Sequence, residues 1–216
     1  MDQGETNIVI RKTGEEKFAT LLSYILHPLL MPVYGFALLF YSPNYVATFT
    51  PSNVKLKILL ITFVFTFVLP TINALILLST GRINSLEMET SKERSIPYGS
   101  AALYYFALFY LFYHQQFPGI FKSLVLGAAF SILLTWFINF KWKISAHTVG
   151  IGGTAGAALG VIYRLHAEMY TVFILLIFFS GILAYARLKL NAHTPSQVYS
   201  GFALGFIVEL GIILFL

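Results

Sequence analysis

Long apolar segments constrain this chain more than any other feature of its sequence. They run for roughly 16 to 25 residues, the length of helix that crosses about 30 Å of hydrocarbon. Charged residues make up only 11% of the chain and hydrophobic residues 57%, whereas about a quarter of the residues in a soluble domain are charged. The sequence therefore predicts an all-α fold, a polytopic transmembrane helical bundle.

Six or seven membrane spans are expected. A polar N-terminal segment, residues 1–17, precedes a single transmembrane helical domain, residues 18–216, and lacks the cleavage pattern of a removable signal peptide. Because the first span contains His27, Pro28 and Pro32, we expect it to be kinked or to enter the membrane without crossing it. The expected spans are Phe18–Tyr41, Lys57–Thr80, Tyr98–Tyr113, Ser123–Phe140, Thr148–Tyr163, Met169–Ala186 and Val198–Leu216.

Two bulk properties narrow the choice of partners. The chain has no cysteine, which excludes disulfides and thiolate metal sites. Its net charge of +5, on little soluble surface, favours anionic headgroups of membrane lipids or phosphate as partners and argues against nucleic acid. The expected location is an integral, multi-pass one in a bacterial inner (cell) membrane.

Three polar islands separate some of the apolar segments: Gly81–Pro97, Lys141–Gly150 and Ala186–Gly201. Two expected spans lie between each island and the next. An even number of crossings returns the chain to the same side of the bilayer. We therefore expect the three islands to meet at one membrane face and to form one site.

The islands share cations, imidazoles and a hydroxyl group. Guanidinium forks and a lysine ammonium suit a phosphate dianion. Imidazoles titrate near neutrality, so one suits a covalent nucleophile and another a proton donor. Expected helix starts at Ser145–Thr148 and at Thr194 would add free backbone amides for an anion. The candidate residues are Lys92, Arg94, Ser145, His147, Arg187 and His193.

Other polar residues have structural interpretations. Gln197 fits a capping box with Thr194 as the N-cap. Glu209 lies inside the last span and is expected to face the bundle, and Gly201 with Gly205 forms a small-xxx-small helix contact. We interpret the following as packing histidines or interfacial anchors: His27, His114, His166, Lys141, Lys143 and Lys189.

The order of these motifs resembles the type 2 phosphatidic acid phosphatase superfamily, the metal-independent membrane lipid phosphatases related to vanadium haloperoxidases. In the third motif, "ARLKLNAHTPSQ", Arg187, His193 and Gln197 fall at the family spacing. Ala186 replaces the family's serine there, and Gln197 replaces its aspartate.

The two earlier motifs match the same family less closely. In "ISAH", Ser145 and His147 match. The first motif is divergent. In "KERSIP", Arg94 matches the family's arginine, but the family's lysine position falls on Glu87. Lys92 is assigned to the lysine role only because it carries the same charge.

The resemblance implies an integral membrane phosphatase that hydrolyses a lipid phosphate or diphosphate without metal or cofactor. His193 would attack phosphorus and carry a phosphohistidine, and His147 would protonate the leaving group. Gln197, one helical turn beyond His193, would orient its imidazole. The phosphoryl oxygens would be bound by Arg187, Arg94, Lys92 and Ser145.

Because an amide carries no charge, we expect slower chemistry, or a negative charge supplied by Glu87, Glu89 or Glu93. The expected substrate is a phospholipid or a polyprenyl phosphate.

The sequence does not decide which side of the membrane the site faces, because the Lys and Arg counts favour the cytoplasm whereas the family usually works on the outer face. Alternatives are a catalytically inactive lipid-binding relative, a transporter of an anionic solute with an inverted repeat, and a structural membrane subunit.

Overall fold

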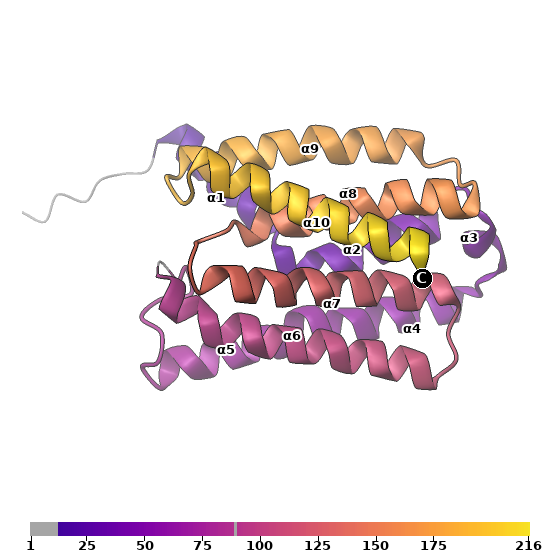
Figure 1. The fold of residues 1–216 in the computed structure, drawn as a ribbon, viewed down its shortest axis with the longest axis horizontal. Helices are drawn as coiled ribbons and strands as arrows, with labels where there is room; N and C mark the ends of the chain where they lie inside the picture. Colours follow the sequence, from indigo (N-terminus) through magenta and orange to yellow (C-terminus); the bar gives the residue numbers. More distant parts are fainter. Residues whose placement is uncertain (1–12, 89) are drawn as a thin grey trace, which may run out of the picture.

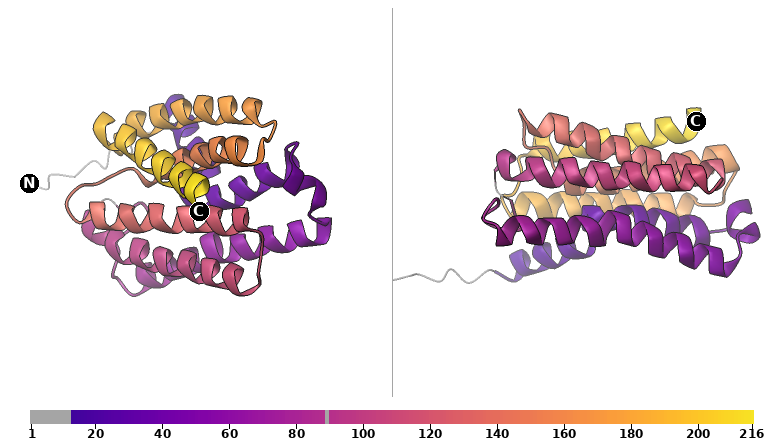
Figure 2. Two further views of the ribbon diagram at one scale, coloured as in Figure 1. Left: turned by 45° about the vertical axis from the view of Figure 1, so that its right-hand side comes forward. Right: turned by 90° about the horizontal axis from the view of Figure 1, so that it is seen from below.

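The protein is described by a computed structural model that covers residues 13–88 and 90–216. The described residues form helices and no strand, so the all-α prediction is confirmed. The long helices lie side by side with roughly aligned axes in every view (Figures 1 and 2). The α-helices are α1 Gly14–Ile25, α2 Met31–Tyr41, α3 Tyr45–Phe49, α4 Ser52–Phe63, α5 Leu69–Ser79, α6 Ser91–His114, α7 Gly119–Asn139, α8 Ala146–Leu165, α9 Tyr170–Lys189 and α10 Pro195–Phe215.

Five helical stretches within the described residues are long and apolar enough to cross a membrane. This supports a multi-pass membrane protein, but the expected six or seven spans are not confirmed. The two long helices outside this set are α6, which begins with the charged sequence "SKERSIP", and α8, which is rich in glycine, alanine and threonine. The five stretches are Gly14–Tyr41, Ser52–Ser79, Gly119–Asn139, Tyr170–Lys189 and Pro195–Phe215.

The first stretch is broken at its prolines, which confirms the expected kink. Helix α1 ends at Ile25, a short 3-10 helix covers Pro28–Leu30, and α2 begins at Met31. Pro28 has no amide proton to donate within a helix, so the chain turns here. The side chain of His27 accepts a hydrogen bond from the amide of Leu29 and caps the short helix.

Helices α8 and α10 touch backbone to backbone. A Cβ atom added at Gly205 would lie 2.0 Å from the carbonyl oxygen of Val149, and one added at Gly201 would lie 2.4 Å from Oγ1 of Thr148. Only glycine leaves room for this approach. The small-xxx-small contact predicted for Gly201 and Gly205 is therefore confirmed.

The glycines of α8 show that the two helices run parallel. A Cβ at Gly152 would meet the carbonyl oxygen of Phe202 and one at Gly156 that of Phe206, so the contacts advance in the same direction along both helices. The N-termini of α8 and α10 consequently lie next to each other. A backbone hydrogen bond of 3.3 Å, from Ser145 N to the carbonyl of Gln197, joins them.

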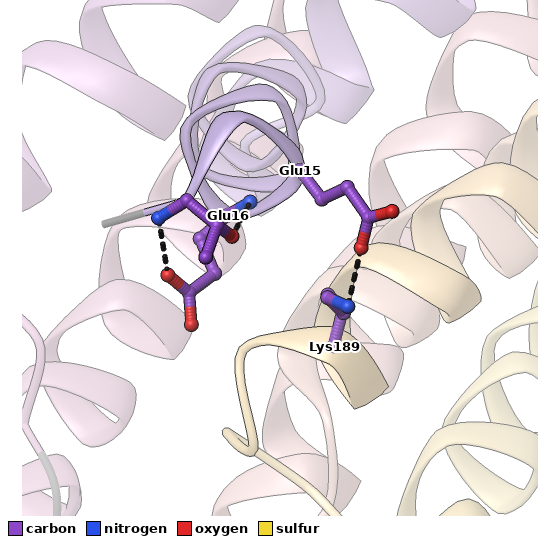
Figure 3. Close-up of polar contacts among 4 residues, drawn as sticks. Glu15, Glu16 and Lys189 are labelled. Atoms are coloured by element: carbon purple, nitrogen blue, oxygen red, sulfur yellow. Dashed lines mark hydrogen bonds and ion pairs between the residues drawn. The ribbon is translucent and has the colours of Figure 1, made fainter. Parts of the chain in front are cut away.

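Helix α1 lies against α9, and an ion pair joins Glu15 at the start of α1 to Lys189 at the end of α9 (Figure 3). Glu16 turns back onto the amide of Thr13 and completes a capping box for α1. Lys189, expected to be an interfacial anchor, thus also fastens the N-terminal helix. This contact places the start of α1 beside the third polar island.

The aromatic core lies toward the opposite end of the bundle. Phe36 and Phe40 of α2 pack against Phe112 of α6 and Phe121 of α7, all at most 1% exposed. The rings of Phe40 and Phe121 meet edge to face with centroids 5.4 Å apart, a geometry that aromatic pairs prefer. This packing fills one end of the bundle, and Phe36 also forms part of the wall of the cavity described below.

We predict that Gly205→Ala destabilises the protein, because the added methyl group would overlap the Val149 carbonyl and overpacking typically costs about 1–3 kcal/mol. Thermal unfolding in detergent measures the effect as a lowered midpoint. Gly211→Ala, in the same helix with nothing within 4 Å of its Cβ position, is the matched control. Equal midpoints for the two variants would contradict the backbone contact.

Candidate functional site

A cavity of about 210 Å³ lies inside the bundle, and residues of all three polar islands line it. Its polar end combines two guanidinium groups and three imidazoles, while much of the remaining wall is apolar. Arg94 comes from the start of α6 and Arg187 from the last turn of α9. The imidazoles are those of His27, His147 and His193.

His193 has a defined tautomer. Its Nδ1 lies 3.2 Å from the carbonyl oxygen of Lys143 and 3.2 Å from Oε1 of Gln197. Both partners only accept, so Nδ1 carries the proton and donates it. The lone pair of His193 is consequently on Nε2, the ring nitrogen that a nucleophilic histidine needs to have free.

Burial keeps this imidazole neutral. His193 is 8% exposed, and its pKa is lowered to about 4, first by burial and then by the positive charges of Arg94 and Arg187. At neutral pH the Nε2 lone pair is therefore available. A neutral, oriented imidazole beside two cations is suited to attack an anionic group that the cations hold.

Gln197 serves both of the roles that the sequence left open. Its Oε1 accepts from the amide of Thr194 at 3.1 Å, which is half of a capping box, and from Nδ1 of His193. The backbone amide can only donate, and this fixes which atom of the side-chain amide is oxygen. One oxygen thus caps α10 and orients the imidazole, as the i, i+4 spacing of 193 and 197 predicts.

The two arginines leave donors unused. Arg94, 7% exposed, donates through Nε to the carbonyl of Met88 at 2.7 Å. Arg187 donates through Nη1 to Oγ of Ser23 at 3.2 Å, and its buried Nε has no hydrogen-bond partner among the described residues. Within residues 13–88 and 90–216, neither guanidinium forms an ion pair with a carboxylate. The free donors suit a bound anion.

His147 is oriented by a residue that the sequence analysis missed. Its Nε2 lies 3.2 Å from the carbonyl oxygen of Ser23 in α1, so Nε2 carries a proton and Nδ1 has no hydrogen-bond partner among the described residues. Because Oγ of the same serine accepts from Arg187, Ser23 joins α1, α8 and α9 at the site. A serine within an apolar span gives no motif that would reveal this role.

His27 was interpreted as a packing histidine, but it lines the cavity. Its ring lies edge to face against that of His147, with centroids 5.6 Å apart and an interplanar angle of 79°. The only sequence signal was a histidine next to the proline of a broken span. His114 and His166 do not line this cavity.

Two expected phosphate ligands are not brought into the cavity. Lys92 is exposed and is not among the residues that line the cavity. Ser145 is fully buried and does not line the cavity, and its Oγ has no hydrogen-bond partner in the part of the chain that the structure describes. Ser145 instead precedes α8 as its N-cap without making a capping hydrogen bond through its side chain. The first amides of α8, unlike those of α10, thus lack a side-chain acceptor.

The acids expected to supply charge behave differently from one another. Glu87 lines the cavity. Glu93 instead accepts hydrogen bonds from the amides of Asn84 and Thr90, which lower its pKa, and it completes the capping box of α6 with Thr90 as the N-cap. Glu89 lies outside the described residues. Glu87 is therefore the candidate that the structure places near His193 and the arginines.

Glu209 lines the same cavity much deeper in the bundle. It is 4% exposed and lies about 18 Å along α10 from Gln197, at 1.5 Å per residue. A Cβ atom at Gly127 of α7 would lie 2.3 Å from its Oε2, so the glycine makes room for this carboxyl group. Its expected position facing the bundle is confirmed.

The described residues contain no group of three or more His, Asp or Glu side chains that could hold a metal ion.

A scan against protein-family models, a search of the curated proteins and a search of the solved structures each found no match to this chain. The family resemblance of the motifs thus stays a prediction, and the site is interpreted from its own geometry.

We predict that Gln197→Asp raises the pKa of His193 from about 4 by about 1–3 units, because a carboxylate beside the imidazole favours its charged form. Nitrogen-15 NMR of the histidine rings across a pH series measures this value. Gln115→Asp, at the far end of α6, adds the same charge away from the site and should leave His193 unchanged. An unshifted His193 in Gln197→Asp would contradict the hydrogen bond.

The same pKa links stability to pH. The folded value, about 4, lies below the unfolded value of about 6.5, so the unfolded state binds the proton more tightly. The contribution of neutral His193 is complete above about pH 6.5 and is lost as the pH falls towards 4. His193→Gln should show a smaller loss of stability over this interval.

Proposed function

We propose that this protein is an integral membrane phosphatase that hydrolyses a lipid phosphate or diphosphate through a phosphohistidine intermediate. The observation that carries the proposal is the state of His193. Its Nδ1–H is held by two acceptors, which leaves Nε2 free, and it shares a cavity with two arginines that lack carboxylate partners among the described residues. This combination is what an anionic electrophile requires.

The proposed reaction has two steps. In the first, the Nε2 lone pair of His193 forms a bond to phosphorus while the bond from phosphorus to the leaving oxygen breaks. His147 takes up a proton from solvent at Nδ1 as the anionic substrate binds, and then gives that proton to the leaving oxygen. In the second, Nδ1 of His147 takes a proton from water, the resulting hydroxide attacks phosphorus, and the N–P bond breaks to release phosphate and restore both histidines.

The arginines act on the charge of the transferring group. Arg94 and Arg187 bind the equatorial oxygens, where negative charge concentrates in phosphoryl transfer. The first amides of α8 add donors at a helix N-terminus. Gln197 fixes the tautomer of His193 but supplies only a dipole, so the cationic phosphohistidine depends on Glu87 for any nearby negative charge. We therefore expect modest turnover.

The walls of the cavity support a lipid as the proposed substrate. Beyond the arginines and histidines they are largely apolar, with Met31, Phe36, Leu124 and Ile132 among the lining residues. An apolar channel next to a cationic end fits a phosphate headgroup whose hydrocarbon chain enters the protein. Phospholipids and polyprenyl phosphates or diphosphates both meet this description.

Seven spans also form part of the proposal. Helix α6 has 24 residues and α8 has 20, lengths of about 36 and 30 Å that reach across the hydrocarbon. Thirteen residues of α8 are buried, and a helix enclosed by its neighbours needs little apolar surface for lipid. Counting both helices as crossings puts the three polar islands on one membrane side.

An anion transporter remains the second candidate, and Glu209 is the observation in its favour. A carboxyl group deep in a membrane helix is typical of ion and substrate pathways, and this one lines the same cavity as the arginines. A transporter would bind phosphate but would not release it from a lipid. Hydrolysis therefore separates the two functions.

We predict that the purified protein in detergent releases phosphate from at least one member of a panel of phosphatidate, phosphatidylglycerol phosphate and polyprenyl diphosphate, and that EDTA does not inhibit it. His193→Ala should lower turnover by about 10⁴-fold or more, because the nucleophile is lost. His147→Ala should lower it by about 10²- to 10⁴-fold, the usual worth of a general acid. Phosphate release measures both effects.

Two control variants and one further site variant complete the test. His114→Ala removes an imidazole outside the cavity, and Lys92→Ala removes an exposed charge from the same helical turn as Arg94, so both should keep wild-type turnover. Arg94→Ala should raise KM and lower kcat. Activity that survives in His193→Ala, or that disappears equally in Lys92→Ala and Arg94→Ala, would contradict the proposed site.

A further inference from the structure

His27 occupies a position in the cavity that the proposed reaction does not use. It follows the last turn of α1 at the break before α2, and its ring contacts that of His147 with centroids 5.6 Å apart. The same cavity holds Arg94 and Arg187. A group bound by the arginines and protonated by His147 is therefore in the neighbourhood of His27.

The tautomer of His27 is the reverse of that of His147. The amide of Leu29 donates to Nδ1 of His27 at 3.4 Å, so Nδ1 is unprotonated and the neutral ring carries its proton on Nε2. In His147 the proton is on Nε2, which donates to Ser23. Among the described residues, Nε2 of His27 and Nδ1 of His147 have no hydrogen-bond partner. Nε2 of His27 can therefore donate a hydrogen bond, whereas Nδ1 of His147 can accept one.

A neutral donor suits this cavity better than a further cation. Two guanidinium groups already share its polar end, and each additional buried charge would cost several kcal/mol in lost solvation. Lys92 and Ser145, expected to bind phosphoryl oxygens, lie outside the cavity. The Nε2–H group of His27 supplies a hydrogen bond without adding charge.

We propose that His27 binds a phosphoryl oxygen of the substrate through Nε2–H, while its Nδ1 stays bonded to the amide of Leu29. The inference rests on the proposed function of the cavity as a phosphoryl-binding site and adds a substrate-binding residue to it. His27 holds the oxygen on the α1–α2 side, and the arginines hold the group from α6 and α9.

Two substitutions separate binding from packing. In His27→Asn, the side-chain oxygen can still accept from the Leu29 amide, as an N-cap asparagine does, but the imidazole Nε2–H is gone. His27→Ala loses both. We expect His27→Asn to keep the wild-type thermal midpoint and to bind inorganic phosphate about 10- to 100-fold more weakly, the usual effect of losing a hydrogen bond to a charged group. Calorimetric titration in detergent measures the affinity.

The controls distinguish this inference from the proposed function. His114→Asn should match the wild type. Suppose that the wild type binds phosphate with an affinity that Arg94→Ala lowers and His27→Asn leaves unchanged. That result would overturn the role of His27 and leave the phosphoryl-binding site in place. If the wild type binds neither inorganic phosphate nor a short-chain phosphatidate, both fall. Titrating the two ligands in parallel also separates free phosphate from a lipid headgroup as the natural ligand.

Nitrogen-15 NMR gives a second test that does not depend on affinity. Free protein should show an unprotonated Nδ1 and a protonated Nε2 for His27, and phosphate should shift the Nε2–H resonance. A proton found on Nδ1 in the free protein would overturn the proposal. The same spectra of His27→Asn identify the resonance.

Discussion

The constraint on which the site depends is the enclosure of two guanidinium groups in a largely apolar cavity. Arginine cannot shed its charge, and a buried charge without a partner costs several kcal/mol. Arg94 and Arg187 use one donor each on neutral oxygens, from Met88 and Ser23, and neither meets a carboxylate in the part of the chain that the structure describes. An anion bound between them would offset this cost, and we propose that a phosphoryl group is that anion.

Helix packing explains why residues far apart in the chain share this cavity. Glycines let α8 and α10 approach in parallel until their backbones touch, which brings the starts of both helices together and sets His147 beside the loop of His193. Helix α1 then closes over them, fastened to α9 by Glu15 and Lys189. The backbone contact between the two glycine-containing helices α8 and α10, and the packing of α1 against α9, therefore bring together the residues of the proposed chemistry.

Short-range patterns predicted much of this arrangement, and long-range packing accounts for the rest. The His193–Gln197 hydrogen bond follows from helical spacing, and the Gly201–Gly205 contact from two small residues four apart. Ser23 and His27 were missed, because their role depends on how a broken first span folds back onto α8. The sequence predicted six or seven spans, whereas five helical stretches of the described residues are long and apolar enough to cross a membrane. Helix α8 is not among them, and most of its residues are buried by neighbouring helices rather than strongly hydrophobic.

The most direct test is an experimental structure of the protein in a lipid nanodisc with tungstate, a phosphate analogue whose heavy atom is located without ambiguity. The account predicts tungstate at the polar end of the cavity, with oxygens on Arg94 and Arg187 and the metal centre next to Nε2 of His193. Tungstate bound elsewhere, or an imidazole at position 193 that presents Nδ1 to it, would contradict the claim that this histidine is the nucleophile.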